Sequence, residues 1–199
     1  MDQTTKKNNF QQLSNSPTHG ISDNFPNRKM WEEIAEKFNG KFNIKHTSGN
    51  VFEIHNITIP HKKWTINISV SDTRPLKFQV SFDSIIDFEI TISWEDLFER
   101  ILKKLGKPEI ELGWDDFDKH YLIKSNHPDL VKKIFTLDIQ KIILKHNINS
   151  IVYQTDSKNG TSEILSVIQT NAGSKDEMIE LIVVFKLIID NLDELKIIR

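Results

Sequence analysis

The feature that most constrains the fold is a strict alternation of apolar and polar residues from Trp64 to Ser71. A period of two predicts a β-strand with one buried side and one side facing solvent. Similar short runs occupy about residues 42–46, 52–59, 78–82 and 88–92. Turn-length gaps separate these runs, whereas a parallel crossover needs about a dozen residues or more. We therefore expect about five consecutive strands joined as an antiparallel meander.

One irregularity interrupts this pattern. The apolar parity changes between Ile54 and Ile57. A single extra residue in a strand shifts the side chains that follow to the other face, so we predict a β-bulge near His55 and Asn56.

A helix is expected before the meander, from about residue 28 to residue 38. Four apolar residues follow the spacing i, i+3, i+4, i+7 of one helix face: Trp31, Ile34, Ala35 and Phe38. Asn27 is the predicted N-cap, and Gly40 is expected to end the helix. Residues 1–26 are polar and show neither helical nor strand periodicity. We predict that they form a disordered tail and that residues 27–199 form a single domain.

Helices and strands are mixed without a repeating pattern after the meander. Further helices are expected at about 93–105 with Ser93 as N-cap, from an Asn126 cap through Ile134, at 137–146 and at 176–195. Further strands are expected at about 121–123, 148–154 and 163–170, the last two joined by a turn containing Asn159-Gly160. This order predicts an α+β fold with one or two antiparallel meander sheets, helices packed on one face and a long C-terminal helix.

The composition excludes several classes of function. The 199 residues contain no cysteine, which removes disulfides, thiolate metal sites and cysteine nucleophiles. The seven glycines form no phosphate-binding loop, and no nucleophile-elbow motif occurs, so we expect no cofactor. The net charge of −2 argues against nucleic-acid binding, and the lysine clusters at 62–63, 103–107 and 132–133 are typical of solvated surfaces. No apolar run is long enough for a signal peptide or a membrane span, so we expect a cytoplasmic protein.

The most distinctive segment lies between Gly113 and Pro128. We expect Phe117 and Tyr121 to pack a strand against the core and Asp118 to accept hydrogen bonds from nearby backbone amides. Asn126 and Pro128 predict a corner at which this strand turns into a helix. This interpretation makes the segment a structural junction.

The same segment, from Gly113 to Phe135, resembles one found in bacterial domain families of unknown function. The shared features are a glycine, polar residues, Phe117-Asp118, an aromatic residue, an apolar strand, then Ser125-Asn126-His127-Pro128 and a helix. The resemblance covers about two dozen residues and implies a bacterial protein but no activity. Some members of such families are membrane-anchored, and this chain differs from them because it has no spanning segment.

Two groups of residues could instead hold a metal ion. Asp115, Asp116, Asp118 and His120 are the types of ligand that bind Mg²⁺ or Mn²⁺ in hydrolases and nucleases. The alternative is a solvated acidic loop. His46, His55 and His61 could meet as a zinc site if their strands are neighbours. Here the alternative is a histidine at the edge of the core and another in a turn.

A protein-binding role remains as the main functional hypothesis. The outer face of the meander carries Thr, Asn, Ser and Gln but few charges, and a sheet has edges that can accept a partner strand. The alternative is an edge that the N-terminal tail or a helix covers. We expect a non-catalytic protein-interaction or accessory domain with a protein partner, and self-association stays open. The alternative is a metal-dependent hydrolase or nuclease that uses Asp115, Asp118 and His120.

Overall fold

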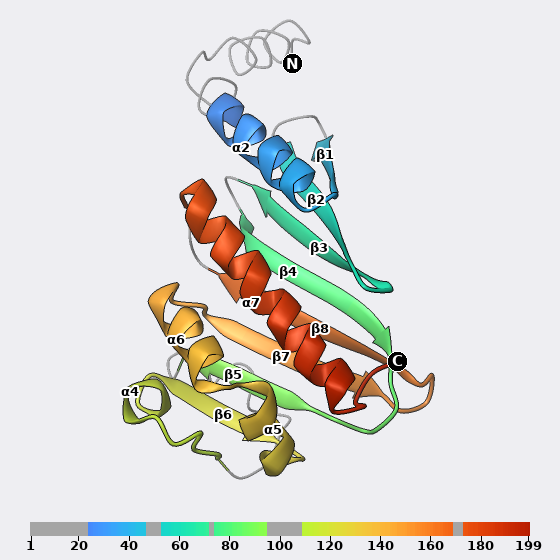
Figure 1. Cartoon of the computed structure of the whole chain (residues 1–199), viewed down its shortest axis with the longest axis vertical. Helices are drawn as coiled ribbons and strands as arrows, with labels where there is room; N and C mark the ends of the chain where they lie inside the picture. The colour runs from blue at the N-terminus through green and yellow to red at the C-terminus, as the bar shows by residue number, and fades with distance from the viewer. Residues whose placement is uncertain (1–23, 47–52, 72–73, 95–108, 169–172) are drawn as a thin grey trace, which may run out of the picture.

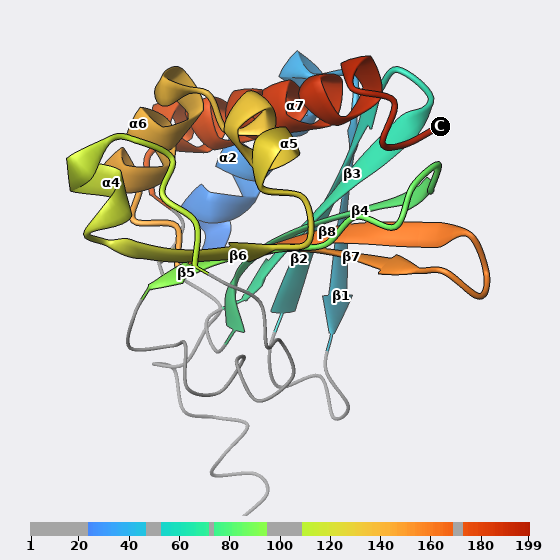
Figure 2. The same ribbon diagram turned by 90° about the horizontal axis from the view of Figure 1, so that it is seen from below.

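The computed structural model describes residues 24–46, 53–71, 74–94, 109–168 and 173–199. Within these residues, eight strands form one antiparallel sheet, and the helices lie together on one side of it (Figures 1 and 2). The predicted α+β class, with a meander, helices on one face and a long C-terminal helix, is confirmed. None of the helices in these ranges is long and apolar enough to cross a membrane.

The sheet combines a four-stranded meander with a second group of four strands. Its strands are β1 (Lys41–His46), β2 (Glu53–His61), β3 (Trp64–Ser71), β4 (Arg74–Asp83), β5 (Ile90–Trp94), β6 (Tyr121–Ser125), β7 (Ser150–Asp156) and β8 (Thr161–Ile168). They lie side by side in the order β1-β2-β3-β4-β8-β7-β5-β6. The sheet is strongly twisted, so that β1 and β6 run in very different directions (Figure 2).

The fifth predicted strand, β5, does not lie beside β4. The β7–β8 hairpin inserts between them, with β8 paired to β4 and β7 paired to β5. The link between β4 and β5 spans residues 84–89. Six extended residues reach roughly 20 Å, which exceeds the three strand spacings of roughly 14 Å that the link must cross. The short link between β4 and β5 therefore requires β5 to run antiparallel to β4, but it does not require the two strands to be neighbours.

The helices cover the apolar side of the sheet. They are α2 (Asn24–Lys37), α4 (Asp115–Asp118), α5 (Pro128–Ile134), α6 (Leu137–Lys145) and α7 (Lys175–Glu194). The long helix α7 crosses the middle of the sheet, where Phe185 stacks on Phe78 with ring centroids 4.4 Å apart. Its N-terminus has a capping box formed by Ser174 and Glu177. The predicted buried stripe of α7 is confirmed from Met178 to Leu192.

The first helix begins earlier than predicted. Because α2 starts at Asn24, Asn27 lies inside the helix and is not its N-cap. The residue with a left-handed backbone after the helix is Asn39, with φ 53°, rather than Gly40. Gly40 has a different role, since a Cβ at this position would collide with the carbonyl oxygen of Thr58. The predicted tail lies outside the described residues up to residue 23.

Three further local predictions are corrected. The register of β2 with β1 and β3 continues through His55 and Asn56, so the predicted β-bulge is wrong. Ile54 faces outward and His55 lies buried on the inner side, which produces the change of apolar parity. Ser93 is a buried residue of β5 and not a helix cap, and the rest of that predicted helix lies outside the described residues. The N-cap of α5 is His127 rather than Asn126.

Candidate binding surface

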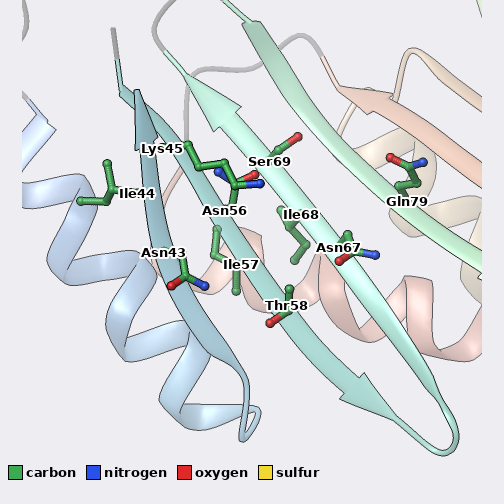
Figure 3. Close-up of a pocket in the computed structure, with 10 residues that line it drawn as sticks. All are labelled: Asn43, Ile44, Lys45, Asn56, Ile57, Thr58, Asn67, Ile68, Ser69 and Gln79. Carbon is green, nitrogen blue, oxygen red and sulfur yellow. The ribbon is translucent and has the colours of Figure 1, made fainter. Parts of the chain in front are cut away.

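A polar hollow lies on the outer side of the meander, opposite the helices (Figure 3). It has a volume of about 440 Å³. We call it the polar face, and its lining residues are Asn43, Ile44, Lys45, Asn56, Ile57, Thr58, Asn67, Ile68, Ser69 and Gln79. They come from β1, β2, β3 and β4, which are consecutive in the sequence and adjacent in the sheet, so the meander itself assembles the surface.

The strand register aligns the polar side chains in two rows. In one row, Asn56 lies between Asn43 on β1 and Ser69 on β3. In the other, Asn67 lies between Thr58 on β2 and Gln79 on β4. Each strand alternates, so the residues between these positions point inward. Ile57, Ile68 and Phe78 are buried on the helix side, and this burial holds the polar side chains outward.

The polar face is rich in groups that both donate and accept hydrogen bonds. Each carboxamide has two donor hydrogens and a carbonyl acceptor. Two of these amides are held by their own strands: Asn56 Nδ2 donates to the carbonyl oxygen of Ile54 at 3.0 Å, and Asn67 Nδ2 donates to that of Thr65 at 3.5 Å. These contacts orient the side chains and leave the Oδ1 acceptors available to a ligand.

The charge on this side of the meander is positive. Lys45 reaches from β1 toward Asn56 (Figure 3), and the register puts Lys41 and Lys77 on the same side as Lys45. Among the described residues, no Asp, Glu or His lines the hollow. The surface therefore offers hydrogen bonds and positive charge, but it has none of the carboxylates or imidazoles that act as general bases or metal ligands.

The two edges of the sheet differ. Beside β6, Glu109 forms a bridge with Lys124, and the Ile110 N–H donates to the Ile123 carbonyl oxygen at 2.9 Å. Residues 109–110 thus occupy that edge. Strand β1 pairs with β2 on one side, and none of its six residues is buried. Within the described ranges, no backbone group pairs with its other side.

Hydrogen bonds and ring contacts hold the Gly113–Pro128 segment in place. The Asp118 carboxylate accepts hydrogen bonds from the Leu112 N–H at 2.9 Å and the Gly113 N–H at 2.8 Å. This confirms that Asp118 binds nearby backbone amides. Phe117 stacks on Tyr121 with ring centroids 4.6 Å apart, and both side chains are buried. Burial raises the pKa of the Tyr121 hydroxyl to about 12.

Asn126 makes long-range contacts that sequence patterns did not indicate. Its Oδ1 accepts from the Glu89 N–H at 2.8 Å, and its Nδ2 donates to the Asp87 carbonyl oxygen at 2.9 Å. Two residues later, Pro128 is the first residue of α5. Asn126 therefore ties the end of β6 to the residues that lead into β5, where the chain turns into a helix.

The acidic residues of this segment do not converge on a common point. His120 Nδ1 lies 2.6 Å from the carbonyl oxygen of Asp116, while the side chains of Asp115 and Asp116 are exposed. Nowhere in the described part of the chain do three or more His, Asp or Glu side chains gather closely enough to hold a metal ion. The geometry uses Asp118 and His120 for local backbone contacts.

The three histidines of the second candidate site are divided between two clusters. His46 Nε2 and His55 Nε2 lie 3.7 Å and 3.3 Å from the carboxylate of Glu53. His61 Nε2 instead lies 2.9 Å from Asp190 Oδ1 on α7. The structure brings two of the histidines near one carboxylate and leaves the third at the other end of β2.

Arg28 also binds the Glu53 carboxylate that lies near the two histidines. Its guanidinium donates to both oxygens of Glu53, with Nε 2.9 Å from Oε2. Burial by itself would raise the pKa of the Glu53 carboxyl, but the hydrogen bonds from Arg28 and His55 outweigh it and lower the pKa below 4.5. The cluster links α2 to β2.

The predicted lysine clusters also have structural partners or face solvent. Lys62, in the turn between β2 and β3, lies 2.9 Å from Asp190 and 2.8 Å from Asp193. It joins that turn to the C-terminal part of α7. Lys132 and Lys133 are exposed on α5, and the predicted cluster at 103–107 lies outside the described residues.

Comparisons with known proteins give one structural relative to report. No protein-family model matches the chain, and no curated protein matches it. The crystal structure of the mycobacterial trehalose monomycolate transport factor A, TtfA, has a similar fold with a TM-score of 0.51 and 8% sequence identity. The match covers 82% of this chain and 93% of TtfA. At this identity the likeness concerns the fold alone.

Proposed function

We propose that this chain is a non-catalytic accessory domain that binds a protein partner through the polar face. One observation carries the proposal: four amide side chains from four neighbouring strands line a hollow, and none of its described lining residues carries a carboxylate or an imidazole. The hollow has the groups needed for recognition but lacks those needed for acid–base or metal chemistry.

The chemistry of the polar face suits a polypeptide. Backbone peptide groups and polar side chains each need a donor, an acceptor or both, and Asn and Gln supply both. Protein–protein interfaces combine many such hydrogen bonds with trapped water around a small apolar centre. Ile57 and Ile68 are buried on the helix side of these strands, so the hollow itself offers mainly polar contacts.

The sheet beneath the polar face supports rigid recognition. The inner sides of β2, β3 and β4 are packed with buried residues, including Ile59, Ile66 and Val80. The backbone of a rigid sheet loses little conformational freedom when a partner binds, which favours affinity. TtfA is named a transport factor, and because one fold can support many functions, the proposal depends on this surface and not on that name.

A pull-down with two matched variants tests the proposal. The immobilised full chain is exposed to extract from cells that express it naturally, and bound proteins are quantified by mass spectrometry. Asn67→Trp places a bulky side chain in the hollow, and Lys132→Trp places the same side chain on α5. We expect at least one protein to bind the unmodified chain and Lys132→Trp equally and to be lost with Asn67→Trp.

Two results would contradict the proposal. In the first, every bound protein is retained by Asn67→Trp, which would exclude the polar face as the contact. In the second, the purified chain hydrolyses a phosphodiester substrate with added Mg²⁺ or Mn²⁺, and Asp118→Asn abolishes this activity. That outcome would establish the hydrolase alternative.

A further inference from the structure

We infer that the partner contributes an acidic extended segment that adds to the sheet as a strand beside β1. This inference rests on the proposed function and specifies the chemistry of its ligand. Strand β1 borders the polar face, and all six of its residues are at least partly exposed. Every second residue of an edge strand directs its N–H and C=O groups away from the sheet, where an added strand can bind them.

The two sides of β1 indicate what such a strand would carry. Lys41 and Lys45 lie on the outer side, and Phe42 and Ile44 lie on the inner side, where they are only half buried. A strand that alternates acidic and apolar residues would place its carboxylates beside the lysines and its apolar side chains beside Phe42 and Ile44. Opposite charges across neighbouring strands stabilise the pairing.

No acidic residue of the neighbouring strands already neutralises these lysines. The outer-side positions of β2 are Ile54, Asn56, Thr58 and Pro60, and those of β3 are Thr65, Asn67, Ser69 and Ser71. Glu53 has the opposite orientation and is bound by Arg28. On β4, the closest charged residue on the outer side is Lys77, which lies opposite Ser69 and adds another positive charge. Within the described strands of the meander, the positive charge of Lys41 and Lys45 is therefore available to a ligand.

A second copy of the chain fits this edge poorly. Antiparallel pairing of β1 with itself must set outer-side residues opposite one another. The register that uses residues 41–45 puts Lys41 opposite Lys45 of the second copy, and this pair occurs twice. Like charges directly opposite each other destabilise a sheet. The same lysines that disfavour self-association favour an acidic strand.

A synthetic peptide provides the test. The probe is a fluorescently labelled Thr-Glu-Val-Glu-Val-Glu-Thr peptide, and its binding to the full chain is measured by fluorescence anisotropy at low salt. One control peptide carries Gln in place of Glu. A second control keeps the glutamates but is N-methylated at every peptide bond, so it retains its charge and cannot donate hydrogen bonds to a strand edge.

Matched charge reversals locate the binding site. K41E/K45E reverses the two lysines of β1, and K132E/K133E makes the same change in net charge on α5. We expect the acidic peptide to bind more tightly than both control peptides. K41E/K45E should weaken it roughly tenfold or more, since two exposed ion pairs become repulsive, and K132E/K133E should leave it unchanged.

Several outcomes would overturn the inference. Equal binding of the N-methylated peptide would mean that charge alone attracts it, and equal weakening by both double variants would mean that the site is not β1. Tighter binding of poly-uridine RNA than of the acidic peptide would indicate a nucleic-acid surface. If a protein captured through the polar face still binds K41E/K45E fully, the inference fails while the proposed function stands. If Asn67→Trp loses no protein, the proposed function fails as well.

Discussion

Asn43 lies directly opposite Asn56 in the register of β1 and β2, on the side of the sheet that faces away from the described helices. Neither amide takes part in the buried core, because the inward positions beside them belong to other residues such as Ile57. Side chains of this kind can be changed without cost to the fold, and this property separates binding from stability in the experiments below.

Removal of amides from the polar face should leave the stability of the protein almost unchanged. We expect Asn67→Ala combined with Gln79→Ala to alter the free energy of unfolding by less than about 0.5 kcal/mol, as exposed substitutions usually do. Ile68→Ala, on the same strand but buried, should cost about 2–5 kcal/mol. Urea denaturation measures both values. A large loss in the double alanine variant would mean that the amides serve the fold.

Asp118 should contribute to stability through two backbone hydrogen bonds. Asp118→Ala leaves the N–H groups of Leu112 and Gly113 without their acceptor. We predict a loss of about 1.5–3 kcal/mol, the range for hydrogen bonds to a charged group. Asp115→Ala, an exposed neighbour, is the control and should change stability by less than about 0.5 kcal/mol. Equal effects of the two variants would contradict the role of Asp118.

Divalent metals should not stabilise the protein. A native site raises the thermal midpoint as metal concentration exceeds its dissociation constant. We predict no change in the thermal midpoint with Mg²⁺, Mn²⁺ or Zn²⁺ at millimolar concentration. A clear rise that Asp118→Ala or His120→Ala removes would support the hydrolase alternative.

The Glu53 cluster predicts a loss of stability in acid. The pKa of Glu53 is lower in the folded protein than its ordinary value of 4.5. The unfolded chain therefore binds more protons around that pH, so stability is fully present above about pH 5 and decreases as the pH falls through the folded pKa. Glu53→Gln should reduce the slope of unfolding free energy against pH between about pH 5 and pH 3. An unchanged slope would show that Glu53 contributes no such linkage.

Gly40 should be required for the position of β1. A Cβ at this residue would collide with the backbone carbonyl of Thr58 on β2, and a backbone atom cannot move aside as a flexible side chain can. We expect Gly40→Ala to destabilise the protein by about 1–3 kcal/mol, as overpacking does. Hydrogen exchange measured on the Gly40→Ala variant and on the unmodified protein should show that the substitution speeds exchange in β1 more than in β7. If Gly40→Ala leaves stability unchanged, the backbone at Gly40 is not held closely against Thr58 of β2.

Local patterns predicted most elements because burial on one side imposes a visible period. The alternation in β3 and the apolar stripe of α7 are both confirmed. The same rule failed at Ile54 and His55, where an apolar residue faces outward and a buried histidine is held by Glu53. A sequence pattern records residue type and not side-chain orientation. An apolar residue that faces outward next to a polar residue that faces inward therefore looks the same as a β-bulge.

The pairing of strands that are distant in the sequence could not be predicted from local patterns. The insertion of β7 and β8 between β4 and β5 depends on contacts between residues far apart in the sequence, such as Tyr153 with Ile90, 63 positions apart, and Val80 with Ile164, 84 positions apart. The polar outer face of the meander could be predicted, since adjacent short-linked strands alternate in phase. Alternation does not report the twist of the sheet, so it could not predict the hollow on this face.

Photo-crosslinking inside cells tests the central claim most directly. A photoreactive phenylalanine analogue is placed at position 67, in the polar face, and in a matched protein at position 132 on α5. The account predicts that irradiation links position 67, but not position 132, to one defined protein. Crosslinks of equal yield and identity from both positions, or none from position 67, would contradict it.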